Sequence, residues 1–282
     1  MRDPIRLSLQ VVLYVFLYVA VAFVFGPLLA WLGGYLVGVT VTGLAAALVT
    51  NALSLRIYEG IRLAAMGLAW TRLSARHLAL GLAGGLASVV LALGLPLLAG
   101  LAHFRPASDS PGSFGAFLFA SILLFFGAAG EEILFRGFAF QILLRAFGPW
   151  TTILPVGVLF ALLHAANPNS TWLGIANTAG FGILFGYAFL RSRDLWLPIG
   201  LHYGWNFTLP LFGAEVSGIR IGVTGYELEW SAPPLWSGGG YGPEGGLFAS
   251  LVLVLLAVLL WKAPVEPAEN RLCVPGSPQP PS

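Results

Sequence analysis

Residues 114–147 read FGAFLFASILLFFGAAGEEILFRGFAFQILLRAF, an almost unbroken apolar run with two adjacent glutamates near its middle. As one helix the run would be roughly 50 Å long, well over the ~30 Å hydrocarbon core of a membrane. We therefore expect it to cross a membrane, and either to extend past the membrane surface or to break near Gly127 and Gly130.

The composition of the whole chain indicates a membrane protein. Of its 282 residues, 57% are hydrophobic and 9% are charged, whereas about 25% of the residues in an ordinary soluble domain are charged. A net charge of +2 without a basic stripe argues against a nucleic-acid partner. The single cysteine excludes an internal disulfide framework. The chain is predicted to be an integral, multi-pass membrane protein.

Further apolar runs predict an all-α, polytopic membrane helix bundle of about eight transmembrane helices, because a spanning helix needs about 20 apolar residues. Gly81 and Gly85, like Gly182 and Gly186, have the small-xxx-small spacing that lets membrane helices pack closely. The predicted spans lie at about 7–32, 35–55, 78–102, 114–147, 151–166, 171–190, 195–213 and 247–262.

The basic residues predict the orientation of this bundle. With the N-terminus inside, eight spans place 11 of the 14 Lys and Arg residues on the inner side, 2 outside and 1 within a span. The outer two are Arg105 and Arg220, and the buried one is Arg136. Because cytoplasmic loops carry an excess of Lys and Arg, both termini are predicted to be cytoplasmic. The expected location is the plasma or inner membrane of a prokaryote.

The spans leave no room for a second domain. Residues 1–262 are predicted to form a single integral membrane domain, whose polar motifs lie within residues 114–210. The longest outer loop is expected at 214–246. Residues 263–282, which are rich in proline and polar residues, are predicted to be a disordered cytoplasmic tail.

Few ionisable side chains lie within the predicted spans. A charge at the membrane centre costs roughly 2.5–3.5 kcal/mol, so each such residue is a candidate functional residue. Of the 12 acidic residues, only Glu131 and Glu132 lie inside an apolar run. Of the four histidines, only His164 and His202 clearly do.

The two glutamates differ in the partners that their helix offers them. Glu132 and Arg136 are four residues apart, so they share a helix face and can pair, with Glu first in the favourable order. This pairing offsets much of the cost of burying both charges. Glu131 faces about 100° away and has no partner on its own helix.

Two later spans repeat the four-residue interval with other polar residues. Phe160 and His164 share a face of the fifth span, and His202 and Asn206 share a face of the seventh. At 1.5 Å per residue, Glu131, His164 and His202 lie ~21, ~20 and ~11 Å from the inner ends of their spans. Three helices are therefore expected to bring polar groups to overlapping depths.

Three motifs in this order resemble those of the CPBP family: Glu131-Glu132-x-x-x-Arg136, Phe160-x-x-x-His164 and His202-x-x-x-Asn206. That family comprises type II CAAX prenyl endopeptidases and bacteriocin-processing or immunity (abortive-infection) membrane proteins. Phe135-Arg136-Gly137 also resembles that family. The resemblance covers about 114–210, and it implies an intramembrane endopeptidase of an eight-helix type. The catalytic set that it implies is Glu131, His164, His202 and Asn206.

The residues themselves suggest how a peptide bond would be hydrolysed. No serine or cysteine is paired with a base, so a covalent nucleophile is not expected. We hypothesise that Glu131, assisted by His164, activates a water that attacks the scissile carbonyl. His202 and Asn206 would donate hydrogen bonds to the oxyanion, each often worth ~2.7–4 kcal/mol. The residues expected to support this set are Glu132, Arg136 and Phe160.

A zinc mechanism is the alternative chemistry. Glu131, His164 and His202 would form a His₂Glu set with water as the fourth ligand. The sequence has no H-E-x-x-H motif, and each ligand would come from a different helix. We favour the reaction without a metal or other cofactor.

Two other classes of function stay open. Buried carboxylates and histidines also form proton relays, so a proton-coupled transporter is one, although such carriers usually show internal repeats. A non-catalytic membrane protein that binds a hydrophobic peptide, as an immunity protein does, is the other. For all of these functions the lipid bilayer is an expected partner. For the enzyme, the expected substrate is a hydrophobic or lipidated peptide or protein, either of the prenylated CAAX type or bacteriocin-like.

Structural roles are alternatives for individual residues. The two glutamates could mark a turn between half-helices, and His164 could cap the end of its helix. His202 could bond a carbonyl of a neighbouring helix, and Arg136 could serve only as the partner of Glu132. The histidines expected to lie at an interface without a role are His77 and His103.

Overall fold

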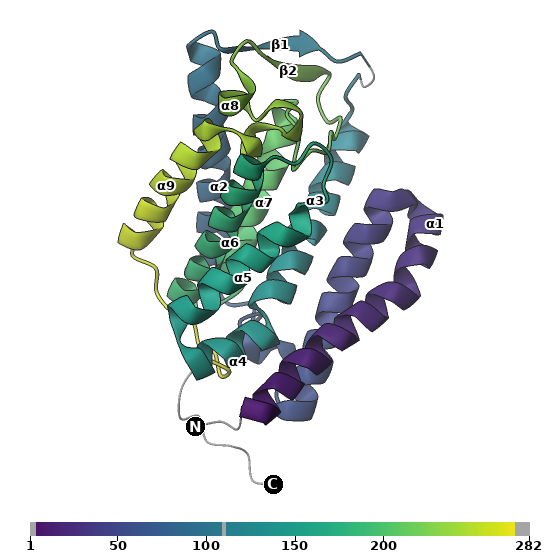
Figure 1. Cartoon of the computed structure of the whole chain (residues 1–282), viewed down its shortest axis with the longest axis vertical. Helices are drawn as coiled ribbons and strands as arrows, with labels where there is room; N and C mark the ends of the chain where they lie inside the picture. Colours follow the sequence, from purple (N-terminus) through teal and green to yellow (C-terminus); the bar gives the residue numbers. More distant parts are fainter. Residues whose placement is uncertain (1–3, 109–110, 274–282) are drawn as a thin grey trace.

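The computed structural model describes residues 4–108 and 111–273 and is mostly helical. The connections between helices gather at two ends (Figure 1). We call them the α4 end, where α1 begins and α9 ends, and the sheet end, where two short strands lie. The helices are α1 (Pro4–Tyr58), η1 (Leu63–Met66), α2 (Arg72–Leu98), α3 (Phe114–Arg136), α4 (Phe138–Phe147), α5 (Pro149–His164), α6 (Trp172–Ser192), α7 (Trp196–Leu211), α8 (Pro234–Ser237), η2 (Gly239–Tyr241), η3 (Pro243–Gly245) and α9 (Leu247–Lys262).

The first helix, α1, is a helical hairpin that contains the first two predicted spans. The backbone leaves the helical conformation at Gly34, whose φ of 79° is accessible to glycine at little cost. The hairpin stands beside the other helices (Figure 1) and packs against α3 and α4. It therefore forms one side wall of the bundle.

The longest apolar run breaks once, at Gly137, between α3 and α4. The break predicted near Gly127 and Gly130 is wrong, because both residues lie within α3. The side chain of Asn51, on α1, replaces the hydrogen bonds that the helix loses. It accepts from the backbone N–H of Phe138 (2.7 Å) and donates to a carbonyl of α3 (3.0 Å). A Cβ at position 137 would collide with this carboxamide, so glycine is required there.

Helices α2 and α7 pack closely through glycines on both sides. A Cβ at Gly81 or Gly85 would meet the backbone of α7, and a Cβ at Gly200 or Gly204 would meet the backbone of α2. The close packing predicted for the small-xxx-small pairs is confirmed, because the second pair, on α6, faces α5: a Cβ at Gly182 would meet the backbone of Gly157, and one at Gly186 would meet the side chain of Ile153. Helix α7 is thereby held at a fixed position.

The predicted all-α fold is accompanied by one small antiparallel sheet, in which β1 (Ala102–Pro106) pairs with β2 (Tyr226–Trp230). In β2 the adjacent Glu227 and Leu228 are both buried, so its burial does not alternate between the two faces of the strand. The buried Glu227 of β2 pairs with Arg105 (2.7 Å) and Arg220 (2.6 Å). Arg105 and Arg220 are the two arginines that the predicted spans place on the outer side of the membrane.

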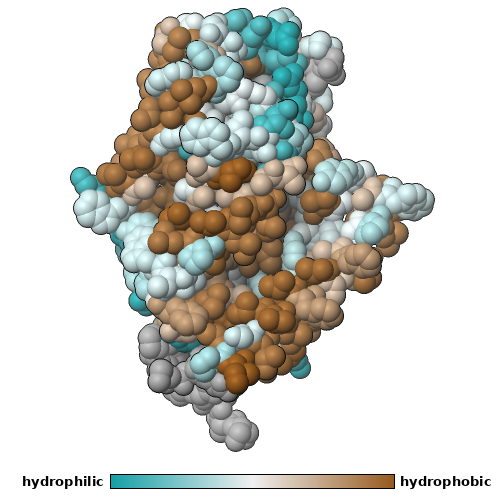
Figure 2. All heavy atoms as spheres, viewed as in Figure 1, coloured by the Kyte–Doolittle hydropathy of each residue, from teal (hydrophilic) through white to brown (hydrophobic). Residues whose placement is uncertain are grey.

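Apolar side chains cover much of the flank of the molecule, whereas hydrophilic atoms gather towards the sheet end (Figure 2). Helices α5 and α9 are apolar but shorter than a full span, with 16 residues each. In the described part of the chain, four helical stretches are long and apolar enough to cross a membrane: Pro4–Tyr58, Arg72–Leu98, Phe114–Phe147 and Trp172–Ser192.

Residues 263–273, predicted to belong to a disordered tail, are docked on the α4 end. The backbone N–H of Ala268 donates to the carbonyl of Ser192 (2.7 Å), and that of Arg271 donates to a carbonyl of η1 (3.0 Å). Disorder is therefore the wrong prediction for this part, because its backbone finds partners in the loops between helices. Residues 274–282 lie outside the described residues.

Candidate active site

The three motifs lie on α3, α5 and α7, and the structure brings their charged side chains together inside the bundle. The carboxylate oxygen Oε2 of Glu131 lies 3.8 Å from Nε2 of His164 and 3.8 Å from Nε2 of His202. Within residues 4–108 and 111–273 this oxygen has no hydrogen-bond partner. The separations exceed a direct hydrogen bond and suit a bridging water molecule.

The depth of Glu131 differs from the prediction, which counted along an unbroken helix to Arg145. Helix α3 ends at Arg136, and α4 begins in a new direction after the break. Glu131 therefore lies only ~8 Å along the helix axis from the end of α3. The predicted ~21 Å is wrong because α4 does not continue the axis of α3.

The neighbouring carboxylate, that of Glu132, is fully buried and has different partners. Its Oε1 accepts from Nη1 of Arg136 (3.1 Å) and lies 2.9 Å from Nδ1 of His202. Arg136 also donates to the carbonyl of Gly182 on α6 (2.6 Å). Glu132 thus binds the predicted arginine and, in addition, orients the imidazole of His202 so that its Nε2 faces Glu131.

His164 is the last residue of α5 and is oriented by its own helix. Its Nδ1 lies 2.8 Å from the carbonyl oxygen of Phe160. Since a carbonyl only accepts, Nδ1 carries the proton, and Nε2 is directed towards Glu131. The ring of Phe160 also packs 4.6 Å from the ring of His164 and 6.0 Å from that of His202. The Phe160 ring therefore supports both imidazoles.

Phe185, on α6, is a residue of this site that the sequence did not single out. Its ring stacks on His202, with centroids 4.9 Å apart and planes at 15°. The guanidinium of Arg136 lies 5.6 Å from the same ring. The chain has 20 phenylalanines, and no spacing relative to the three motifs distinguishes this one. It could be found only from the packing of α6 against α7.

A cavity of about 430 Å³ lies in front of these groups. Glu131 and His164 line this cavity, and so does Asn206, the other predicted catalytic residue on α7 besides His202. Helix α1 supplies one wall, which includes Thr40, and the loop after α7 covers the cavity with residues that include Ile219. The cavity thus combines residues of the motif-bearing core with residues from both flanking parts of the chain.

The donor geometry does not favour the zinc alternative. In the part of the chain that the structure describes, no group of three or more His, Cys, Asp or Glu side chains is arranged to hold a metal ion. Glu131, His164 and His202 do not meet that requirement. We therefore derive no step through a metal.

His77, expected to lie at an interface without a role, is buried in α2. Its Nδ1 lies 2.7 Å from Oδ2 of Asp194, and the other carboxylate oxygen accepts from the backbone N–H of Trp196 (3.2 Å). That expectation is wrong, because the pair closes the first turn of α7, the helix that carries His202. His103, by contrast, is exposed on β1.

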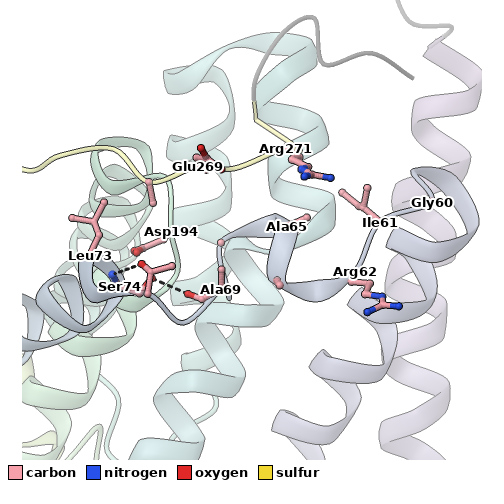
Figure 3. A pocket seen from close by; sticks show the side chains of 14 residues that line it. Gly60, Ile61, Arg62, Ala65, Ala69, Leu73, Ser74, Asp194, Glu269 and Arg271 are labelled. Atoms are coloured by element: carbon pink, nitrogen blue, oxygen red, sulfur yellow. Dashed lines mark hydrogen bonds between the residues drawn. The ribbon is translucent and has the colours of Figure 1, made fainter. Parts of the chain in front are cut away.

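A second cavity, of about 630 Å³, lies at the α4 end (Figure 3). It is formed by the loop before η1, the start of α2 and the docked tail, with Arg62, Ser74 and Arg271 among its residues. None of the predicted catalytic residues lines it. The two cavities therefore lie at different levels of the bundle.

Long apolar helices and a carboxylate–imidazole cluster inside the bundle define an integral membrane protein with a candidate hydrolytic site. Residues 113–208 match the family model described as type II CAAX prenyl endopeptidase Rce1-like. This segment contains all three motifs, and it confirms the resemblance to the CPBP family. The matched family is a protease family, which supports an enzymatic role. No curated protein matches the chain.

Proposed function

We propose that the protein is an intramembrane endopeptidase that uses a glutamate-activated water. The observation that carries this proposal is one carboxylate oxygen of Glu131 placed 3.8 Å from two imidazole nitrogens beside a cavity. A carboxylate and an imidazole at hydrogen-bonding reach of the same water can remove its proton as it attacks. The family match supports the same reaction class.

Each residue has a distinct part in the proposed reaction. Glu131, assisted by His164, takes a proton from the attacking water and passes it to the leaving amine. With Nδ1 of His202 bound to Glu132, a protonated imidazole directs Nε2–H at the oxyanion. Asn206 adds an amide donor from one turn further along α7. The supporting residues Glu132, Arg136 and Phe160 keep the two imidazoles in place.

We also propose that the chain crosses the membrane with about eight helical segments and with both termini inside. Basic side chains at the α4 end include Arg56 in the last turn of α1, Arg62 just before η1 and Arg145 on α4. Arg105 and Arg220 lie at the sheet end, where both pair with Glu227 of β2. The α4 end is then the cytoplasmic end, in the plasma membrane of a prokaryote. Residues 1–262 form one membrane domain around the core at 114–210.

The substrate is a hydrophobic or lipidated peptide or protein, either a prenylated CAAX-type chain or a bacteriocin-like one. Detergent-purified protein is incubated with prenylated and unprenylated hydrophobic peptides, and mass spectrometry measures the products. Glu131→Gln keeps the shape of the side chain but removes the base, so cleavage falls by about 100-fold or more. Glu229→Gln, on the exposed sheet, is the matched control and keeps wild-type cleavage.

Three results would contradict this proposal. If Glu131→Gln cleaved the peptides at the wild-type rate, Glu131 would not be the base that activates the water. Peptide binding without cleavage by the wild-type protein would favour the non-catalytic binding protein, and Glu131-dependent uptake into proteoliposomes would favour the transporter.

The proposed chemistry also predicts that cleavage is insensitive to metal removal. The protein is treated with a strong chelator, and elemental analysis verifies that no metal is left. We expect the rate of peptide cleavage to stay unchanged, because Glu131 and His164 activate the water themselves. Loss of cleavage in chelator, with recovery on adding zinc, would instead support Glu131, His164 and His202 as ligands.

A further inference from the structure

The first limb of the α1 hairpin lies antiparallel to α3. It runs from the α4 end to the sheet end, whereas α3 runs from the sheet end to the α4 end (Figure 1). The hydroxyl of Tyr14 fixes the register, because it donates to the carbonyl oxygen of Leu134 (2.8 Å). Tyr18 lies one turn further along the same face of α1, roughly 6 Å nearer the sheet end. One turn back along α3 leads from Leu134 to Gly130 and Glu131, so Tyr18 lies at the level of Glu131.

The second limb of the hairpin places the Tyr18 side chain at the same level. A Cβ at Gly43 would lie 3.7 Å from the hydroxyl oxygen of Tyr18. The next residue meets α3, since a Cβ at Gly130 would lie 2.9 Å from the backbone nitrogen of Leu44. Glu131 follows directly, and its carboxylate is close enough to the Tyr18 hydroxyl for the two groups to interact electrostatically. The hydroxyl therefore lies beside Glu131, where α1 contacts α3.

The Tyr18 hydroxyl is available for a ligand. Tyr18 is half-buried and lines the same cavity of about 430 Å³ as Glu131. In the described part of the chain, no residue forms a hydrogen bond with this hydroxyl. Tyr14 differs, because it is buried and its hydroxyl already has two partners, at 2.8 and 2.9 Å. Tyr18 therefore keeps both its donor and its acceptor for a molecule in the cavity.

A peptide in this cavity needs hydrogen bonds for its backbone. Apolar residues form much of the wall, among them Leu36, Val39 and Leu123. An unpaired backbone N–H or C=O is costly in such surroundings. The polar residues of the core helices are already used by the proposed reaction. A hydroxyl on the α1 wall beside Glu131 can pair with a backbone group close to the bond that is cleaved.

We infer that Tyr18 is a substrate-binding residue of this site, whose hydroxyl forms a hydrogen bond with the peptide backbone next to the cleaved bond. This inference rests on the proposed function and adds to it a residue from outside the matched segment 113–208. It applies to prenylated and unprenylated peptides alike, because both have the same backbone. The α1 hairpin is then part of the binding site as well as a side wall of the bundle.

Tyr18→Phe tests the inference, because it removes the hydroxyl and keeps the ring. Binding is measured in detergent in the Glu131→Gln background, by fluorescence polarisation of a labelled farnesylated CAAX-type peptide and of its unprenylated counterpart. We expect the dissociation constant of each peptide that binds to rise by about 2- to 10-fold, the effect of one lost hydrogen bond. In the active protein KM should rise by a similar factor, whereas kcat should change by less than about 2-fold.

Two further variants separate binding from structure. Tyr187→Phe, the matched control, removes a tyrosine hydroxyl on α6, outside the cavity, where the ring stacks on Trp150 (centroids 5.9 Å apart). It should bind the peptides as tightly as its parent. Tyr14→Phe removes two hydrogen bonds inside the protein, so it should lower the midpoint of thermal unfolding. Tyr18→Phe should leave that midpoint unchanged, because its hydroxyl has no partner in the folded protein.

Peptides that contain an ester identify the backbone group that the hydroxyl binds. Each amide close to the cleaved bond is replaced in turn by an ester, which removes the N–H and weakens the carbonyl as an acceptor. We expect one of these esters to weaken binding to the Glu131→Gln protein. The same ester should have no further effect when Tyr18→Phe is present, because both changes remove the same hydrogen bond.

Three results would overturn the inference and leave the proposed function intact. The first is an unchanged dissociation constant for Tyr18→Phe with peptides that the wild-type protein cleaves. The second is a set of esters whose effects are the same with and without the Tyr18 hydroxyl. The third is a lower unfolding midpoint for Tyr18→Phe, which would give the hydroxyl a structural role. If neither peptide bound or was cleaved, the proposed function would fall, and this inference with it.

Discussion

Two neighbouring glutamates acquire different properties from their surroundings. Glu131 is 38% exposed and faces the cavity, whereas Glu132 is buried between a guanidinium and an imidazole. Helical spacing predicted the pairing of Glu132 with Arg136, because residues four apart share a face. The bond from His202 to Glu132 joins residues 70 positions apart, and no local pattern contains it.

Arg136→Met is expected to destabilise the protein by about 3–5 kcal/mol, because it leaves the buried Glu132 without its guanidinium partner. The midpoint of thermal unfolding in detergent measures the loss. The double variant Glu132→Gln/Arg136→Met removes both charges and should recover part of it. An Arg136→Met protein as stable as wild type would show that the ion pair does not hold α3 in place.

At the scale of helices, the site depends on elements that are positioned by residues outside the motifs. Asn51 on α1 supports the end of α3 at Gly137, and Asp194 with His77 closes the start of α7. Glycines let α2 approach the backbone of α7. Because His202 and Asn206 lie on α7, a shift of this helix would move them away from Glu131.

Gly85→Ala tests this dependence. Its new Cβ would meet the backbone of α7 near Leu201 and Trp205, so the helices must separate. We expect a loss of about 1–3 kcal/mol in stability together with a lower cleavage rate.

The control is Gly94→Ala on the same helix, where a Cβ meets no atom within 4 Å. There, alanine should be neutral or stabilising by up to about 1 kcal/mol. Equal unfolding midpoints and equal cleavage rates for the two variants would contradict the close contact of α2 with α7.

At the scale of the whole molecule, the two ends have different constructions. The sheet end carries the paired arginines and the cover of the cavity, whereas the α4 end carries the loops on which residues 263–273 dock. The docked tail places the thiol of Cys273 3.4 Å from Oε1 of Gln141 on α4. The tail therefore belongs to the folded structure up to that point.

Burial raises the pKa of the Cys273 thiol from 9.0 to about 12. In the folded protein at neutral pH this thiol should react with a maleimide far more slowly than Ala64→Cys in a Cys273→Ser background. Unfolding in detergent and denaturant should abolish the difference, because it restores the ordinary pKa. Equal rates in the folded state would mean that the tail is undocked.

The raised pKa of the Cys273 thiol also makes the stability of the fold depend on pH. Because the folded state disfavours the thiolate, the unfolded chain ionises first as the pH rises. This contribution to stability is present below the ordinary pKa and is lost as the pH rises from 9.0 towards about 12.

Membrane helices, the Glu132–Arg136 pair and the three motifs could all be predicted from the amino-acid order, because each depends on helical spacing or on the length of an apolar run. The break at Gly137, the partner of His77 and the contact of Phe185 with His202 could not. Each is decided by which helices become neighbours, and these contacts join residues that are distant in the chain. The cavity in front of Glu131 has the same origin, since its walls come from α1, the core helices and the loop after α7, and no single stretch of sequence contains all three.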